Sequence, residues 1–189
     1  MRLVPLVPLL VTVACVSGCA DAPGAPTTPA TLSILLKDSP YTDAQAVFVT
    51  FSEISVHASG GTFETLPFAN NVSTRTCDLK KLVDTQELLG TTAPPTGHYT
   101  QIRIVVASAT LYFDSPSSGP ACGAVLTVPA GRNASVMVPS GEVRINQDFD
   151  VTSSKATTIL LDFDGGRSVN LTGSGIYMLS PVISVVTVQ

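Results

Sequence analysis

Short segments in which apolar residues recur at every second position run along most of this 189-residue chain, and turn residues separate them. In the segment 101–106, for example, Ile102, Ile104 and Val106 alternate with the intervening residues. A period of two places successive side chains on opposite faces of a strand, so one face of each segment can be buried. Roughly ten such segments, separated by Gly, Pro, Asn and Ser, predict an antiparallel β-sandwich.

We expect strands over residues 31–36, 47–51, 54–56, 62–66, 99–106, 124–128, 135–138, 149–151, 157–163, 168–171 and 182–188. The apolar positions change parity between Phe51 and Ile54, which predicts a β-bulge or a change of sheet near residues 52–53. Gly60-Gly61 predicts a hairpin turn that leads into the strand at residues 62–66.

One helix is expected over residues 78–89. Asp78 is a suitable N-cap, the apolar residues that begin at Leu79 recur at i, i+3 and i+4, and Gly90 marks the end. The predicted fold class is therefore all-β: an antiparallel sandwich of Ig-like or transthyretin-like Greek-key type with one short helix.

The first residues have the features of a secretory signal peptide. Arg2 supplies a positive charge, residues 3–16 are almost all apolar, and two small residues precede Cys19. The apolar run is shorter than the roughly 20 residues of a membrane-spanning helix. Its end resembles the lipobox of bacterial lipoproteins, which implies that residues 1–18 are cleaved and that Cys19 receives a diacylglycerol. The alternative is an ordinary cleaved signal with an incidental cysteine.

Residues 19–30 are rich in Pro, Ala and Thr, which predicts an extended tether in front of a domain at residues 31–189. In the lipoprotein class, Asp directly after the lipidated Cys is the inner-membrane retention signal. That position is Ala20 here, so the resemblance implies the outer membrane if the host has two membranes. We expect a lipid-anchored protein of the cell envelope.

The charge balance limits the classes of partner. The chain has 14 Asp and Glu against 10 Lys and Arg, and no cluster of basic residues. Nucleic acid and anionic lipid surfaces are therefore not expected as partners. The expected membrane contact is the N-terminal lipid, and an envelope protein or a glycan is the expected ligand class. The absence of Trp weakens the case for a sugar-stacking module.

The cysteines divide between the two parts of the chain. Cys15 leaves with the signal and Cys19 carries the lipid, so Cys77 and Cys122 remain in the mature domain. In an oxidising compartment, a disulfide between these two is expected. Two separate buried thiols are the alternative. A zinc site with the two histidines would lack the close ligand pairs that are typical of such sites.

Asp148-Phe149-Asp150 and Asp162-Phe163-Asp164 each place two carboxylates on one face of a strand. If the segments formed a hairpin around residues 152–156, Asp148 would lie near Asp162. Like charges opposite each other destabilise a strand pair, and Ca²⁺ accepts roughly six to eight oxygen ligands. These four aspartates and Asp38 are therefore candidate calcium ligands. The alternative is two solvated acidic faces that discourage edge-to-edge aggregation.

The sequence contains no Gly-x-Ser-x-Gly elbow, no His-Glu-x-x-His motif and no phosphate-binding Gly loop. Its two histidines, His57 and His98, leave little material for acid–base catalysis. We therefore expect no enzyme activity and assign no catalytic residue.

An ordered series of short blocks resembles a known family. The blocks are Asp38-Ser39-Pro40, Val47-Phe48-Val49-Thr50-Phe51, Ile54-Ser55-Val56-His57, Asp78-Leu79-Lys80-Lys81-Leu82, Gly97-His98-Tyr99-Thr100-Gln101-Ile102-Arg103, Val138-Pro139-Ser140-Gly141, Leu161-Asp162-Phe163-Asp164 and Tyr177-Met178-Leu179-Ser180-Pro181-Val182-Ile183. Together they are similar to the domain of unknown function DUF4382 of prokaryotic secreted and lipid-anchored proteins. The resemblance covers about residues 31–187 and implies no activity, because the family has none established.

Three functions are compatible with these observations. The favoured expectation is a lipid-anchored domain that binds a ligand at the cell envelope without catalysis. One alternative is a hydrolase whose site is built from dispersed Asp and His residues. The other is a structural component of an envelope assembly.

Overall fold

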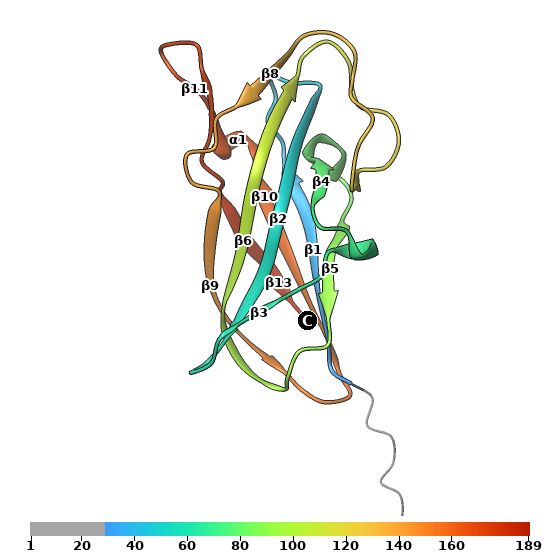
Figure 1. Ribbon diagram of the computed structural model, residues 1–189, viewed down its shortest axis with the longest axis vertical. Coiled ribbons are helices and arrows are strands. Elements are labelled where there is room, and N and C mark those ends of the chain that lie inside the picture. The colour runs from blue at the N-terminus through green and yellow to red at the C-terminus, as the bar shows by residue number, and fades with distance from the viewer. Residues whose placement is uncertain (1–28) are drawn as a thin grey trace, which may run out of the picture.

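The computed structural model describes residues 29–189, and two β-sheets pack face to face in it (Figure 1). The first sheet has the order β13-β10-β1-β5. Its strands are β1 (Thr31–Ser39), β5 (Glu87–Thr92), β10 (Ala156–Asp164) and β13 (Ile183–Val188). The predicted signal peptide, Cys15, Cys19 and most of the tether lie outside the described residues.

The second sheet has the order β7-β4-β2-β6-β8, with β3 paired to β2 and β9 paired to β6. Its strands are β2 (Ala46–Ala58), β3 (Phe63–Thr65), β4 (Arg75–Asp78), β6 (Gly97–Tyr112), β7 (Cys122–Gly123), β8 (Asn133–Val136) and β9 (Glu142–Val151). A separate hairpin joins β11 (Val169–Leu171) to β12 (Tyr177–Leu179). The helical turns are η1 (Ala69–Asn71), η2 (Leu79–Leu82) and α1 (Gly165–Ser168), of which only α1 is an α-helix.

The all-β sandwich with a single short helix is thus confirmed, with one difference in strand direction. β1 and β10 are parallel, with Leu35 opposite Leu160. All other pairs of named strands within residues 29–189 are antiparallel. The first sheet is therefore mixed, because β10 leaves the sheet of β9 and inserts beside β1.

The core lies between the two sheets and is built from the inward residues of the long strands. In β1, every second residue is buried, including Leu32, Ile34 and Leu36. Phe51 of β2 meets Phe163 of β10 edge-to-face across the core, with ring centroids 6.3 Å apart. The period of two in the sequence therefore reports burial correctly in β1, whereas β2 and β10 also bury runs of consecutive residues.

The change of parity in β2 is a true irregularity of the sheet. The pairing of β2 with β6 shifts register between Thr50 and Phe51 and again between Phe51 and Glu53. The predicted bulge is confirmed. The hairpin at Gly60-Gly61 is also confirmed, since β3 pairs antiparallel with the end of β2.

The helix predicted over residues 78–89 is wrong. Asp78 does cap a turn by accepting a hydrogen bond from the Lys80 amide, but the turn is only η2 and the chain then enters β5. Pairing of β5 with the free edge of β1 outweighs the local helical pattern. Gly90 lies inside β5, where an added Cβ would approach the Pro67 carbonyl oxygen to 2.7 Å.

The strand predicted over residues 124–128 is also wrong. β7 ends at Gly123, before this segment, and the chain continues as a loop to β8. In this loop, Val125 is 86% exposed and Val128 is 65% exposed. Leu126 alone turns inward, where it packs against Ala46, Phe48 and Tyr112, so this apolar run is a surface connection that one buried side chain holds to the domain.

Candidate functional site

Cys77 and Cys122 form a disulfide, as predicted. They lie directly opposite each other on β4 and β7. Next to the bond, the Asp78 amide donates a hydrogen bond to the Ala121 carbonyl, 2.8 Å away. The disulfide therefore attaches the long connection between β6 and β8 to the edge of the second sheet.

Asp78 holds the same connection from inside the protein. It is 1% exposed, and its Oδ1 accepts hydrogen bonds from the amides of Val47 and Lys80. Its Oδ2 accepts a hydrogen bond from the Ser117 hydroxyl. A buried carboxylate with three donors is satisfied, so Asp78 has a structural role that the sequence indicated only as a helix cap.

The predicted hairpin between the two acidic segments is wrong. β9, which carries Asp148 and Asp150, pairs with β6 in the second sheet. β10, which carries Asp162 and Asp164, pairs with β1 and β13 in the first sheet.

The single calcium site predicted from these four residues and Asp38 is therefore not assembled. Within residues 29–189, no group of three or more His, Cys, Asp or Glu side chains is arranged to hold a metal ion.

Asp148 and Asp150 lie on either side of His98. Nδ1 of His98 is 2.9 Å from Oδ1 of Asp150, and Nε2 is 3.7 Å from Oδ1 of Asp148. All three side chains are at least half exposed. His98 and Asp150 border an open groove of about 500 Å³, whose other lining residues are Thr96, Gly97, Val151, Thr152 and Ser153.

The His98 group has one feature of a hydrolytic site and lacks another. A carboxylate on Nδ1 is the contact that orients a general base. Nε2, which would have to face a nucleophile, faces Asp148 instead, and no hydroxyl of the described residues hydrogen-bonds to either ring nitrogen. His57 lies elsewhere, with Nδ1 3.5 Å from the Thr100 hydroxyl.

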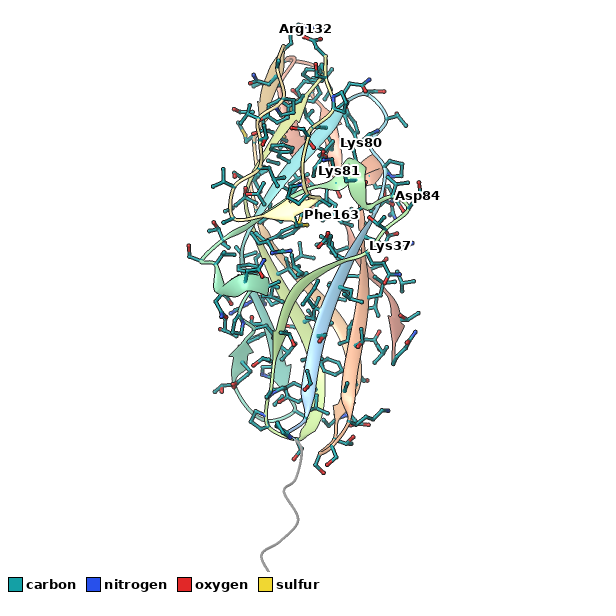
Figure 2. All side chains as sticks on the ribbon, turned by 90° about the vertical axis from the view of Figure 1, so that its right-hand side faces the viewer. Lys37, Lys80, Lys81, Asp84, Arg132 and Phe163 are labelled. Atoms are coloured by element: carbon teal, nitrogen blue, oxygen red, sulfur yellow. A yellow bond between two sulfur atoms is a disulfide. The ribbon has the colours of Figure 1, made fainter. Side chains whose placement is uncertain are left out.

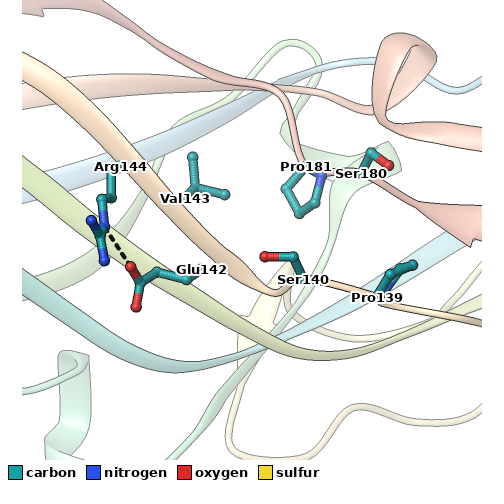
Figure 3. Close-up of a pocket in the computed structure, with 7 residues that line it drawn as sticks. All are labelled: Pro139, Ser140, Glu142, Val143, Arg144, Ser180 and Pro181. Atoms are coloured by element: carbon teal, nitrogen blue, oxygen red, sulfur yellow. Dashed lines mark hydrogen bonds and ion pairs between the residues drawn. The ribbon is translucent and has the colours of Figure 1, made fainter.

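A second open groove of about 350 Å³ lies where the β8–β9 and β12–β13 connections meet (Figure 3). It is lined by Pro139, Ser140, Glu142, Val143, Arg144, Ser180 and Pro181. The Arg144 guanidinium is already paired with Glu142. The sequence pattern did not indicate this groove, because common residues from distant segments form it.

Asp162 and Asp164 lie at the end of β10 and accept local hydrogen bonds. The Ser39 hydroxyl donates to Oδ2 of Asp162 at 2.9 Å, and the Arg167 amide donates to Oδ1 of Asp164 at 2.9 Å. Oδ1 of Asp162 is buried and has no hydrogen-bond partner in the described structure.

Asp38 is the most unusual of the predicted site residues, because it is only 3% exposed. Its Oδ1 accepts a hydrogen bond from the Gly165 amide at 3.2 Å, whereas its buried Oδ2 has no partner among residues 29–189. Burial raises the pKa of Asp38 to about 7, the negative charges of Asp162 and Asp164 add to this rise, and the Gly165 amide and Lys80 oppose it.

The two ends of the sandwich differ in what they expose. The described chain enters β1 at one end of the long axis (Figure 1). The His98 groove lies near this end: Gly97 pairs with Val151, and the connection that follows Val151 is hydrogen-bonded to the first residue of β1, from the Thr31 amide to the Lys155 carbonyl. The β11–β12 hairpin and the β7–β8 connection lie at the opposite end (Figure 1).

We call this opposite end the distal end. Arg132, the last residue before β8, marks its tip (Figure 2). The apolar side chains that these two connections expose are Val125, Val128, Leu171 and Ile176.

No helix of the described part of the chain is long and apolar enough to cross a membrane. No curated protein and no solved structure is significantly similar to the chain. The model of one family, the domain of unknown function DUF4382, matches residues 29–181, which is most of the described domain and includes the Asp38 and Asp164 segments. The chain therefore belongs to the DUF4382 family.

Proposed function

We propose that this protein is a lipid-anchored domain of the cell envelope that binds a ligand without catalysing a reaction. The observation that carries the proposal is the separation of the ends of the sandwich: the N-terminal entry to β1 lies at one end and the exposed loops at the other (Figure 1). A lipid on Cys19 would place the distal end farthest from the membrane. The sheets between them provide a rigid spacer.

The distal end exposes apolar side chains in two separate connections. Val125 is in the β7–β8 connection, and Leu171 and Ile176 flank the tip of the β11–β12 hairpin, at 58% and 46% exposure. Exposed apolar residues mark interaction surfaces where they gather, and four of the eight exposed large apolar side chains of residues 29–189 lie in these two connections. An envelope protein is the ligand class that this chemistry favours, with a glycan as the alternative.

The anchor is tested by fractionation. We expect Cys19→Ala to give an unprocessed or soluble product, because the acyl chains supply the membrane affinity, at about 0.8 kcal/mol for each buried methylene group. A variant that is still processed and still fractionates with membranes would contradict the lipid anchor.

The binding end is tested by site-specific photo-crosslinking in living cells. A photoreactive residue at Val125 or Ile176 should give a discrete cross-linked product, and one at Ser153 in the His98 groove serves as the matched control at the opposite end. Products from Ser153 but from neither distal position would place the ligand at the wrong end and contradict the proposal.

The His98–Asp150 contact is the observation that favours the alternative, a hydrolase built from dispersed residues. That function predicts turnover of ester or peptide substrates by the purified protein, with loss of turnover in His98→Ala. Turnover that depends on His98 would replace the binding proposal.

A purely structural role in an envelope assembly predicts a third outcome: loss of a larger complex on deletion of the protein, with no cross-link at the distal end.

A further inference from the structure

The geometry around Asp38 points to a control of the distal end by a single proton. The alternation in β1 turns Leu36 and then Asp38 toward the core, so a carboxyl group follows the last apolar side chain of the inward row. Oδ1 of Asp38 accepts a single hydrogen bond, from the Gly165 amide, and Oδ2 is buried without a hydrogen-bond partner in the described structure. An ionised carboxylate in this position is poorly compensated.

The charges that face Asp38 do not supply the missing compensation. Asp38 is opposite Phe163 in β10, which places Asp162 and Asp164 on either side of it along that strand. The cation on the side of η2 is Lys80, in the same half of the molecule as Phe163 (Figure 2).

Lys80 directs its ammonium group elsewhere. Its Nζ donates to the Tyr41 carbonyl at 2.9 Å. Burial raises the pKa of Tyr41 itself above its usual range, so this side chain supplies no negative or positive charge near Asp38. On α1, Arg167 approaches Asp164 at 3.9 Å and is mostly exposed. The surroundings therefore favour the neutral form of Asp38.

The Asp38 carboxyl group joins the turn after β1 to α1, the connection that leads into the β11–β12 hairpin. Gly165 is the first residue of α1, and a Cβ added there would lie 3.0 Å from Oδ1 of Asp38 and 3.2 Å from the Tyr41 amide nitrogen. The α1 turn is thus packed directly against the turn that follows β1.

α1 in turn fixes the base of the hairpin. The hydroxyl of Ser168, the last residue of α1, donates to the Asp164 carbonyl and accepts from the Val182 amide. β11 begins at the next residue, so the position of the hairpin depends on the contact between Asp38 and Gly165.

We propose that Asp38 is a pH-sensitive contact that controls the order of the β11–β12 hairpin. Neutral Asp38 keeps α1 packed against the turn after β1, and ionised Asp38 loosens α1 and the hairpin that follows. As a means of regulating ligand binding, this rests on the proposed function of the distal end. The structural change itself requires no ligand.

The direction of the effect follows from linkage. The Asp38 carboxyl is neutral up to about pH 7 when α1 is packed and has the ordinary pKa near 4 when the contact opens. Opening therefore releases a proton and becomes more favourable as the pH rises. Between about pH 6 and about pH 8, the opening equilibrium should increase about tenfold.

Hydrogen–deuterium exchange of the mature, lipidated protein in detergent measures this opening. After correction for the intrinsic pH dependence of exchange, amides of residues 165–179 should exchange about tenfold faster at about pH 8 than at about pH 6. Amides of β2 and β6 should not change. Asp38→Asn, which stays neutral, should keep the hairpin protected at both values. Asp148→Asn, an exposed carboxylate on β9, should behave as wild type.

Two results would overturn the proposal. One is equal corrected protection of residues 165–179 at both pH values in the wild type. The other is the same loss of protection in Asp38→Asn as in the wild type. If Asp38→Asn does not fold, carboxyl ¹³C NMR of the wild type decides: titration of Asp38 near 7 together with the hairpin amides supports the proposal, and an ordinary value near 4 refutes it.

Because these measurements use no ligand, they are independent of the cross-linking experiment. A pH-sensitive hairpin without distal cross-links would retain this inference and reject the binding function. Distal cross-links together with a hairpin that is insensitive to pH would retain the binding function and reject this inference.

Discussion

Removal of the Cys77–Cys122 disulfide should lower the free energy of unfolding by about 4 kcal/mol without changing the fold. The two cysteines are 45 residues apart in the sequence, and the chain between them contains η2, β5, all of β6 and the connection that follows it. In the unfolded state the bond closes this whole segment into a loop, so its removal frees a large number of conformations.

The magnitude follows from the entropy of loop closure. For a separation of 45 residues, the chain-entropy model gives a loss of about 13 cal/mol/K from the unfolded state, or about 4 kcal/mol near room temperature. For a domain of this size, that corresponds to a decrease of roughly 8–16 °C in the melting temperature. The fold should persist without the disulfide, because the Asp78 amide still donates a hydrogen bond to the Ala121 carbonyl and the Asp78 carboxylate still accepts one from the Ser117 hydroxyl.

The assay is urea unfolding of Cys77→Ala/Cys122→Ala, followed by circular dichroism and compared with the oxidised wild type. Wild type with its disulfide reduced is the matched control, and its unfolding curve should coincide with that of the variant. A loss of stability below about 1 kcal/mol, with an unchanged denaturant slope, would refute the loop-closure reasoning. Two reactive thiols in the denatured, unreduced wild type would refute the bond itself.

Three further predictions concern single residues. Gly141→Ala should lower the free energy of unfolding by more than about 2 kcal/mol, because the new Cβ would overlap the Val106 carbonyl oxygen. Gly173→Ala is the control: no atom lies within 4 Å of its new Cβ, so it should change the free energy of unfolding by less than about 0.5 kcal/mol. Equal urea midpoints for these two variants would contradict the packing at Gly141. Asp78→Ala should lower the free energy of unfolding by about 3 kcal/mol in the same assay, since it leaves three hydrogen-bond donors without their acceptor. A decrease under about 1 kcal/mol would show that these donors find other partners. Burial raises the pKa of Asp38 from 3.8 to about 7, so the stability that its neutral form contributes is complete below about pH 4 and is lost as the pH rises to about 7. Asp38→Asn should therefore match the wild type near pH 4 and exceed its stability by up to roughly 4 kcal/mol near pH 8; a variant that is less stable at both values would contradict the uncompensated burial of this carboxyl.

Much of the candidate site was visible in the sequence as residue types but not as an arrangement. The aspartates were identified by their alternation with Phe149 and Phe163, and that alternation is correct in the structure, where both aromatic side chains are buried. Their predicted proximity depended on a register between β9 and β10 that no local pattern contains. His98, to which the sequence pattern assigned no role, is the residue that Asp148 and Asp150 contact.

The helix predicted over residues 78–89 shows the same limit in another form. The helical spacing after Asp78 describes η2 correctly, but the helix does not continue beyond this turn. Residues 87–92 instead form a strand, because the free edge of β1 offers hydrogen-bond partners to their backbone. A strand that completes a sheet gains hydrogen bonds and buried area from a partner distant in sequence. Local propensity differs between conformations by less than this gain.

The sequence by itself determined the all-β class, the faces of the long strands, the bulge in β2 and the pairing of Cys77 with Cys122. Each of these depends on a period of two, on turn residues or on the number of cysteines left in the domain, all of which are local or countable. Tertiary structure alone decided that β10 lies parallel to β1, that the two acidic segments belong to different sheets, and that Asp38 is buried against Gly165. The physical reason is that the choice of strand partner maximises burial and hydrogen bonding over the whole domain, so residues far apart in the chain set the surroundings, and hence the charge state, of a single carboxyl group.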